Sequence, residues 1–324
     1  MEFVKLDYKL ARINCKLEFY KKMLKKNDVI DIVSLGTACS FDEIEKIKNY
    51  TKKMGLTPRI FLEKETTIKK PLAHEFASIA ASQRFAQFKK SAESDSKIIW
   101  CTRGGYGTAE ILPFLMKMKK PKIAKILIGF SDISSLNNFL IEEWGWKIIS
   151  APMLAQLVRG AVSKNSEKAI LDLVFGKTKE LKYKISGAKI ALNAKITGGC
   201  ISVLAGSFGT KNQLNWKDKI LFLEDEGEDG ERLDRYFSQI CTIISETKKK
   251  PKAVLLGNFL EANPHGTPKA KNIEIAIKRF GENLGSIPLL IEKSKCLGHS
   301  KNTMPLILGL DSKITKDGFL VQKI

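Results

Sequence analysis

Apolar and polar positions follow an alternating pattern between residues 28 and 150. Short apolar runs predict buried strands, and between them apolar residues recur at the spacing of one helix face. The expected strands are residues 29–35, 59–62, 97–101, 123–130 and 147–149, and the expected helices are residues 41–55, 74–89, 108–118 and 132–143. Because strands and helices alternate with loops of only a few residues, the pattern predicts an α/β fold with a parallel sheet and helices on both faces.

Residues 155–187 interrupt this alternation, because they hold one helical stretch followed by an extended, lysine-rich segment. Such a segment is typical of a connection between domains, and 324 residues suit two domains. Further strands are expected at residues 188–196, 219–223, 253–256, 287–291 and 304–308, and further helices at residues 200–206 and 231–244. We therefore expect a basic N-terminal extension (1–27), an N-terminal α/β domain (28–154), the connection (155–187) and a smaller C-terminal α/β domain (188–324).

The charge balance is the unusual feature of the composition. Lysine and arginine number 55 against 35 acidic residues, a formal net charge of +20, but only eight of the 55 are arginine. Base recognition favours arginine, and single-strand binding interleaves aromatic side chains with basic ones. The composition therefore indicates a solvated, lysine-rich surface, and we expect no nucleic-acid partner.

Cysteine, histidine and apolar content limit the possible locations and cofactors. The six cysteines show no short spacing, the three histidines are dispersed, and no apolar run reaches the roughly 18 residues of a membrane span. Residues 1–27 carry charges throughout and lack the apolar core of a secretory signal. We expect reduced thiols, a cytoplasmic location, no metal and no stable membrane insertion.

A glycine-rich loop, residues 102–108, joins a predicted strand to a predicted helix. Its three glycines allow backbone N–H groups to approach a ligand, and a helix N-terminus favours negative charge. The spacing does not match a dinucleotide-binding motif, because position 110 is glutamate, and the end of a phosphate-binding P-loop is missing. Ligand binding and simple packing of the turn both stay open.

Ser131 lies in a second loop between a strand and a helix. A serine at such a turn can be a nucleophile, with the N–H that follows it holding an oxyanion. A lone serine at this place more commonly caps the helix. A nucleophilic role requires a base and an orienting acid elsewhere in the chain.

Candidate partners for Ser131 lie in the second half of the chain. Glu224 and Asp225 follow a strongly apolar strand. A buried carboxylate there would need a partner such as an imidazole, whereas the alternative places both residues in a polar loop. His299 follows a predicted strand through a glycine. His265 competes with it, but the turn-forming residues around His265 indicate an exposed loop.

Taken in order, these motifs resemble the LD-carboxypeptidase family of serine peptidases, which includes the microcin-immunity peptidases. The resemblance runs from about residue 28 to the C-terminus, and seven short motifs in the family's order are specific together. They are Arg103-Gly104-Gly105-Tyr106-Gly107, Gly129-Phe130-Ser131-Asp132-Ile133, Gly198-Gly199, Gly209-Thr210, Leu221-Phe222-Leu223-Glu224-Asp225, Arg232-Leu233-Asp234-Arg235 and Gly298-His299.

The resemblance implies a Ser–His–Glu catalytic triad. Ser131 matches the family's nucleophile, His299 its base and Glu224 the acid that orients the imidazole. The backbone N–H of Asp132 and that of one glycine of the 104–105 pair would form the oxyanion hole. The resemblance also implies a flavodoxin-like N-terminal domain, a triad assembled across the domain interface, a homodimer, and no metal or cofactor.

The implied reaction is hydrolysis of an L-to-D peptide bond, which releases the terminal D-Ala of a muropeptide tetrapeptide in cell-wall recycling. Arg103 is a candidate to bind the free carboxylate, with an ion pair to Glu110 as the alternative. Tyr106 is a second candidate for substrate binding.

Three departures from the family pattern leave the triad intact. Residues 34–38 replace a Pro-Ser, residues 150–153 replace a His-Gly-Pro-Met, and Cys200 replaces the asparagine of a Gly-Gly-Asn. Two alternative functions also stay open. One is a microcin-type immunity peptidase that cleaves an aminoacyl or peptidyl nucleotide, for which Trp216 is available to stack on the nucleobase. The other is a non-catalytic basic protein that binds an anion.

Overall fold

The computed structural model describes residues 23–61, 79–260 and 270–324. A six-stranded sheet has the order β11-β5-β4-β3-β1-β2, in which only β11 is antiparallel to its neighbour. The strands are β1 (Val29–Val33), β2 (Thr57–Ile60), β3 (Ile98–Cys101), β4 (Ile126–Ile128), β5 (Lys147–Ser150) and β11 (Leu306–Leu308). The parallel strands follow the flavodoxin order 2-1-3-4-5, so the predicted α/β fold with a parallel sheet is confirmed.

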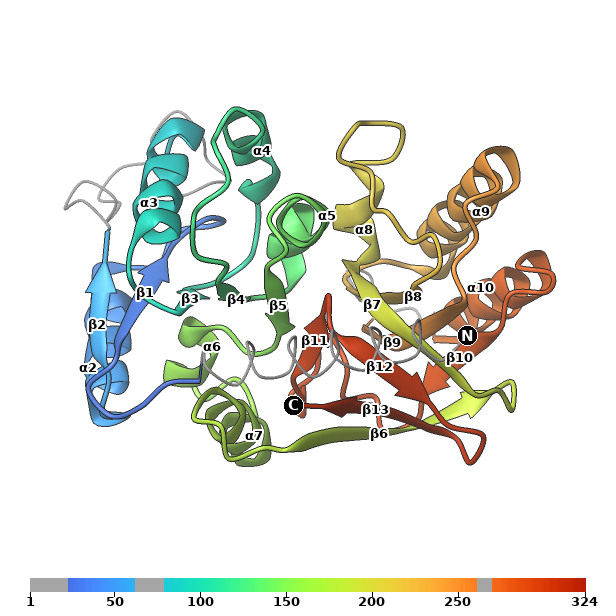
Figure 1. Ribbon diagram of the computed structural model, residues 1–324. Coiled ribbons are helices and arrows are strands. Elements are labelled where there is room, and N and C mark those ends of the chain that lie inside the picture. Colours follow the sequence, from blue (N-terminus) through green and yellow to red (C-terminus); the bar gives the residue numbers. More distant parts are fainter. Residues whose placement is uncertain (1–22, 62–78, 261–269) are drawn as a thin grey trace, which may run out of the picture.

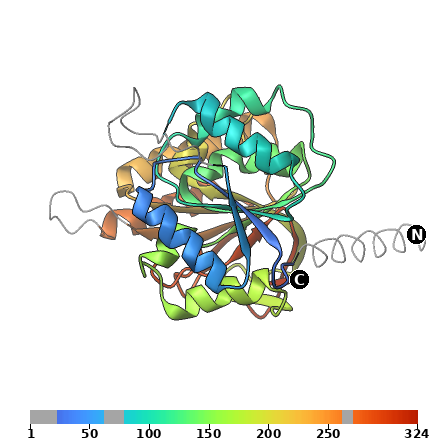
Figure 2. The same ribbon diagram turned by 90° about the vertical axis from the view of Figure 1, so that its left-hand side faces the viewer.

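Helices cover both faces of this sheet. Figures 1 and 2 show α3 and α4 on one face and α2 and α7 on the other. The helices are α2 (Phe41–Lys53), α3 (Ala81–Glu93), α4 (Leu112–Leu115), α5 (Asn137–Glu142), α6 (Leu154–Val158) and α7 (Lys164–Val174). Helix α2 begins with a capping box, in which Ser40 and Glu43 each bond the other's backbone N–H through their side chains. Because helices cover both faces, β3 and β4 are buried at every position.

The second half of the chain forms a closed barrel in the order β10-β6-β13-β12-β7-β8-β9 (right side of Figure 1). Strands β7 to β10 pair parallel, and β6, β12 and β13 close the barrel with antiparallel pairs. The strands are β6 (Glu180–Gly187), β7 (Leu192–Cys200), β8 (Ile220–Glu226), β9 (Ala253–Leu260), β10 (Leu289–Glu292), β12 (Asp311–Ile314) and β13 (Phe319–Lys323). The helices are α8 (Ile201–Ala205), α9 (Gly230–Thr247) and α10 (Ala270–Asn283).

Several elements differ from the expectation. The predicted helices at 108–118 and 132–143 each begin with a 3-10 turn, η2 (Thr108–Ile111) and η3 (Ser131–Leu136). Positive φ angles at Gly107 and Ser131 turn the chain sharply just before or within these turns, which favours the tighter i to i+3 winding. Strand β8 continues to Glu226, so the interpretation of Glu224 and Asp225 as a polar loop is wrong. Strand β6 lies within the segment expected to connect the domains.

The two halves share one hydrophobic core. The largest cluster of buried side chains includes Trp100 of the sheet and Phe222 of the barrel, and β11 adds a late segment of the chain to the sheet. A second cluster lies under α9 and α10, where the rings of Phe237 and Phe280 stack with centroids 4.2 Å apart. Because the halves pack through a continuous core, the loops at their junction have fixed positions.

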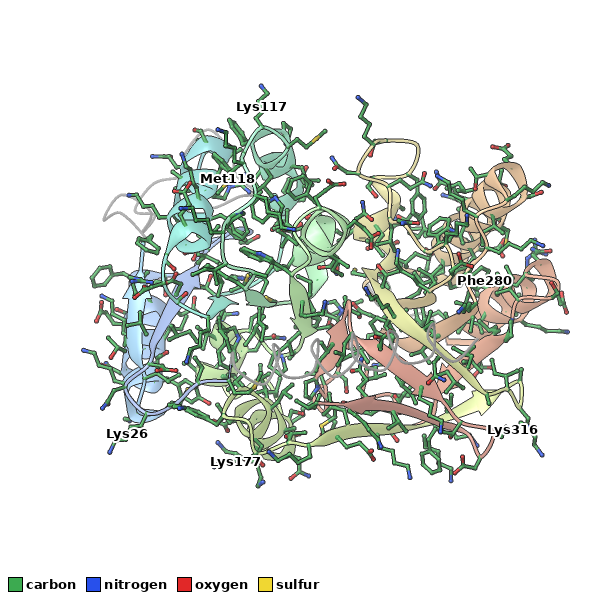
Figure 3. The ribbon with its side chains drawn as sticks, in the orientation of Figure 1. Lys26, Lys117, Met118, Lys177, Phe280 and Lys316 are labelled. Carbon is green, nitrogen blue, oxygen red and sulfur yellow. The ribbon has the colours of Figure 1, made fainter. Side chains whose placement is uncertain are left out.

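Lysine side chains project from the outside of both halves. Figure 3 labels Lys26, Lys117, Lys177 and Lys316, which are all exposed and point away from the molecule, whereas Phe280 is buried. The described helices include none that is long and apolar enough to cross a membrane.

Candidate active site

The loops that follow β1, β3 and β4 meet at the carboxyl end of the sheet. The strand order reverses between β1 and β3, and ligands of open α/β sheets bind at such a point. The loops approach one another closely. A Cβ atom on Gly36 would lie 2.5 Å from the carbonyl oxygen of Gly104 and 2.8 Å from Asp132 Oδ2. Glycine at position 36 therefore allows the three loops to pack together.

Ser131 has a strained backbone. Its φ is +60°, in the left-handed region that costs a non-glycine residue about 1–2 kcal/mol, and it directly follows the extended residue Phe130. This strand–turn–helix geometry exposes a side chain at the top of the sheet, as in the nucleophile elbow of hydrolases. The Ser131 hydroxyl has no hydrogen-bond partner among the described residues, so it does not cap the helix.

Gly104 lies directly against Ser131. A Cβ atom on Gly104 would be 3.1 Å from Ser131 Cβ and 3.3 Å from its Oγ. Within the described residues, the backbone N–H groups of Gly104 and Asp132 donate no hydrogen bond. Two N–H groups near a hydroxyl on a turn are therefore available to a ligand oxygen.

Asp132 fixes the glycine-rich loop to the Ser131 loop. Its Oδ2 accepts hydrogen bonds from the backbone N–H of Thr108 at 2.9 Å and from the Thr108 hydroxyl at 2.6 Å. Burial raises the pKa of Asp132, and the bonds from Thr108 oppose that rise. The carboxylate is thus engaged in holding the loop, which leaves its backbone N–H as the group that can serve a ligand.

Arg84 of α3 is a buried arginine that the sequence did not mark as important. It donates to the carbonyl oxygens of Ile79 at 2.9 Å and of Leu35 at 2.8 Å, and it also bonds the Gly107 carbonyl and the Glu110 carboxylate. It joins the loops that follow β1 and β3. No short motif surrounds it, so only the tertiary structure reveals this role.

Arg103 does not pair with Glu110, because Glu110 pairs with Arg84 instead. The Arg103 guanidinium donates to the Ala38 carbonyl oxygen at 3.2 Å and is half-buried. The alternative expected for Arg103 is therefore wrong, and its proposed role toward a carboxylate stays a prediction.

Gly105 and Tyr106 lie at the outer part of the glycine-rich loop. A Cβ atom on Gly105 would lie 2.1 Å from Thr37 Oγ1, and the Tyr106 N–H donates to that hydroxyl at 3.0 Å. The Tyr106 side chain is 57% exposed. Its position on the loop is compatible with substrate contact, and that role stays a prediction.

Glu224 is fully buried near the end of β8. The register of β8 against β9 shifts between Leu223 and Asp225, which marks a β-bulge or similar irregularity at Glu224. Such bulges reorient a side chain and are common beside active sites. The chain at Gly298 passes directly over the Glu224 carboxylate, since a Cβ atom on Gly298 would lie 2.5 Å from Glu224 Oε2. The φ of Gly298 is +97°, a conformation that favours glycine.

His299 is held by Glu224 through two hydrogen bonds to one oxygen. The His299 backbone N–H donates to Glu224 Oε2 at 2.9 Å, and Nδ1 lies 2.6 Å from the same atom. Asn258 donates to the His299 carbonyl oxygen at 2.6 Å. In this arrangement Nδ1 carries a proton and donates a hydrogen bond to the carboxylate, which leaves Nε2 as the nitrogen that can act as a base.

The charge of the imidazole is stabilised by acidic neighbours. Burial alone lowers the pKa of His299, but Glu224, and to a lesser degree Glu226 and Asp225, outweigh it, so the pKa is raised above its ordinary value. The Glu226 carboxylate lies 3.6 Å from Nε2. Glu226 was not predicted as a site residue, although it lies only two residues after Glu224, which was.

Phe130 joins the serine to the histidine. Its ring centroid is 4.6 Å from that of His299, and Ser131 is the next residue along the chain. The residues predicted from the sequence, Ser131, His299 and Glu224, therefore lie together at the junction of sheet and barrel. No hydrogen bond between described residues links Ser131 to His299. Catalytic hydrogen bonds are often long without substrate and tighten when it binds.

Asp225 faces the opposite side of the strand from Glu224 and bonds a thiol. Its Oδ2 accepts from the Ser202 N–H at 2.8 Å and from Cys200 Sγ at 3.2 Å. Burial chiefly, with the charge of Glu224, raises the pKa of Asp225 to about 6. The Cys200 N–H donates to Ser134 Oγ at 3.1 Å, so Cys200 also joins η3 to the barrel.

Trp216 is buried, and its indole N–H donates to the Lys249 carbonyl oxygen at 2.7 Å. It belongs to the core under α9 and is not available to stack on a nucleobase. His265 and its surroundings lie outside the described residues. Across residues 23–61, 79–260 and 270–324, no group of three or more His, Cys, Asp and Glu side chains is placed to hold a metal ion, and the five cysteines there are free thiols.

Comparison with known families agrees with this arrangement. Residues 30–151 match the LD-carboxypeptidase N-terminal domain, and residues 193–314 match the LD-carboxypeptidase C-terminal domain. The chain belongs to the LD-carboxypeptidase family. The first match contains Ser131 and the second contains Glu224 and His299, so the family's two domains supply the serine and the histidine–carboxylate pair separately.

Individual relatives of the LD-carboxypeptidase family support a peptidase. A Rickettsia conorii protein that is named for a carboxypeptidase by similarity is 33% identical over 69% of this chain and 69% of its own length. A murein tetrapeptide carboxypeptidase of Pseudomonas aeruginosa is 30% identical over 63% of this chain and 68% of its own. The crystal structure of a muramoyltetrapeptide carboxypeptidase from Oxalobacter formigenes matches with a TM-score of 0.75 and 23% sequence identity. The match covers 91% of this chain and 99% of the Oxalobacter formigenes chain, so the two proteins share the fold.

Proposed function

We propose that this chain is a serine LD-carboxypeptidase that hydrolyses the L-to-D bond of muropeptide tetrapeptides and releases the terminal D-Ala. The observation that carries the proposal is that Ser131, on a strained turn, directly follows Phe130, whose ring contacts an imidazole with Nδ1 2.6 Å from the buried Glu224 carboxylate. The murein tetrapeptide carboxypeptidase of Pseudomonas aeruginosa supports the substrate class. A cytoplasmic location and a homodimer belong to the same proposal.

In the first half of the proposed reaction, His299 Nε2 accepts the proton of Ser131 Oγ as that oxygen attacks the scissile carbonyl carbon. The negative charge that develops on the carbonyl oxygen is held by the free N–H groups of Asp132 and Gly104. Glu224 stabilises the imidazolium and fixes its orientation. The carbon–nitrogen bond then breaks, and the imidazolium protonates the departing amine of D-Ala.

In the second half, a water molecule attacks the ester formed on Ser131. His299 accepts a proton from that water, the same N–H groups hold the second oxyanion, and the proton passes back to Ser131 Oγ as the ester bond breaks. The peptide leaves with a new carboxylate. Arg103 is the proposed partner of the carboxylate on the leaving D-Ala, because its guanidinium bonds only a backbone carbonyl and forms no ion pair in the described part of the chain.

Incubation of the purified protein with a muropeptide tetrapeptide tests the proposal directly. We expect free D-Ala by mass spectrometry, and no release from a matched peptide that ends in L-Ala. Fluorophosphonate labelling at Ser131 would separate an enzyme from a non-catalytic anion-binding protein. Labelling without release of D-Ala would contradict the proposed substrate, and absence of both would contradict a serine peptidase.

A further inference from the structure

Glu226 faces the reactive nitrogen of the candidate base. Its Oε2 is 3.6 Å from His299 Nε2, while Glu224 holds Nδ1 on the other side of the ring. The side chain of Glu226 is 57% exposed, and within the described part of this lysine-rich chain it pairs with no lysine or arginine. The imidazole thus lies between two carboxylates, one buried and one at the surface.

This contact conflicts with the proposed chemistry. Nε2 must be unprotonated and must face Ser131 before it can accept the serine proton. A carboxylate beside Nε2 favours a proton on that nitrogen and a ring orientation toward the carboxylate. The described structure has the Glu226 contact and no hydrogen bond between Ser131 and His299.

We propose that Glu226 is a positioning residue that holds the His299 imidazole protonated and turned from Ser131 until substrate enters. The inference rests on the proposed function, since it assigns His299 as the base. Substrate that enters the junction displaces the exposed Glu226 carboxylate, the imidazole releases its Nε2 proton to solvent, and Nε2 then becomes available to Ser131. Glu226 would therefore set the pH at which the free enzyme can react.

The other groups around the imidazole cannot replace Glu226 in this role. Glu224 and Asp225 from β8 are buried, and each is engaged by its own hydrogen bonds. Phe130, which precedes η3, offers an apolar ring, and Asn258 of β9 bonds only the His299 backbone. Behind Asp225, the Cys200 thiol of β7 donates to that carboxylate, and burial raises the pKa of the thiol.

The substitution Glu226→Gln keeps the shape and removes the charge. The imidazole is buried but the Glu226 side chain is 57% exposed, so water screens that charge, and at 3.6 Å it should move the pKa of the imidazole by about one unit. Because Glu226 favours the charged imidazole, its loss lowers the pKa of His299 and raises the neutral fraction at a given pH. The acidic limb of kcat/KM should move down by about one pH unit, which is a rate increase of about tenfold on that limb.

Imidazole titration by NMR tests the contact without any turnover. The chain has three histidines, and the variant His299→Gln identifies the His299 signal by its loss. We expect the His299 titration to shift down in Glu226→Gln and in Glu226→Ala. Glu246→Gln is the matched control, because it removes one exposed carboxylate at the far end of α9, about 24 Å from the start of that helix. It should leave the titration unchanged.

Two results would overturn the inference. One is a His299 titration that coincides in Glu226→Gln and the wild type, or that moves equally in Glu246→Gln. The other is a rate profile that falls uniformly at all pH values, which is what a merely structural loss produces. Failure of the wild type to release D-Ala would instead contradict the proposed function, so the two failures are distinguishable.

Discussion

The substitution Ser131→Ala separates a nucleophilic serine from a structural one. In the structure the hydroxyl caps no helix and has no partner among the described residues, so its removal breaks no hydrogen bond there. Alanine must adopt the same φ of +60°, which it tolerates about as poorly as serine does. We expect the free energy of unfolding to change by less than about 0.5 kcal/mol.

The effect on activity should be far larger than the effect on stability. The hydroxyl is needed only when the carbon–oxygen bond forms, so its loss should lower kcat by about 10⁴ or more and change KM little. That factor corresponds to about 5.4 kcal/mol of transition-state stabilisation. A serine that merely capped a helix would show the reverse pattern, with about 1 kcal/mol of stability lost and catalysis retained.

The assay pairs D-Ala release with thermal melts of the same preparations. Ser163→Ala is the matched control, because the Ser163 side chain does cap a helix and accepts from the Ser166 N–H at 3.3 Å. We expect the control to melt lower with wild-type kcat. The assignment fails if Ser131→Ala melts lower yet releases D-Ala at the wild-type rate. It also fails if Ser131→Ala combined with Glu224→Ala is far worse than either single variant.

Three further outcomes follow from the site. Gly104→Ala places a methyl group 3.3 Å from Ser131 Oγ and should lower kcat by about 10² or more with little loss of stability. Gly206→Ala is the control, because its Cβ meets only the Val203 carbonyl oxygen at 3.4 Å. The control should change neither kcat nor the melting temperature. Glu224→Gln should lower kcat by about 10⁴, measured at constant pH, because the neutral amide cannot stabilise the imidazolium. EDTA should leave D-Ala release unchanged, and loss of activity restored by zinc would contradict the serine mechanism.

Most strands of the first half were predictable because each is a short apolar run between turn signals, whereas β2, with the sequence Thr-Pro-Arg-Ile, begins and ends two residues before the expected bounds. The strands of the second half were less predictable. Strand β6 alternates buried Leu181, Tyr183 and Ile185 with exposed lysines, which is a period of two, yet its charge made it resemble a linker. Strand β11 is three residues long and joins a sheet whose other strands lie more than 150 residues earlier. Local pattern carries no information about such a pairing.

The candidate triad was predictable from short motifs, but the groups that hold it were not. Ser131 and Glu224 each follow an apolar run in the sequence, which is a signal that can be recognised without the structure. Arg84 lies within an ordinary amphipathic helix, and three of its four contacts, to Leu35, Gly107 and Glu110, come from segments that only the fold brings together. The contact between Glu226 and His299 likewise depends on the path of the chain at Gly298, which no residue spacing specifies.

Three consecutive acids, Glu224, Asp225 and Glu226, have three different environments because β8 alternates its side chains and carries an irregular register at its end. Glu224 meets the imidazole, Asp225 meets the Cys200 thiol behind it, and Glu226 reaches the surface beside Nε2. This explains why cysteine is compatible with position 200. A thiol can donate to the Asp225 carboxylate, as an amide N–H could, and burial, which raises the pKa of Cys200, keeps that donor protonated. The departure from the family pattern therefore changes the support behind Glu224 and leaves the imidazole contact in place.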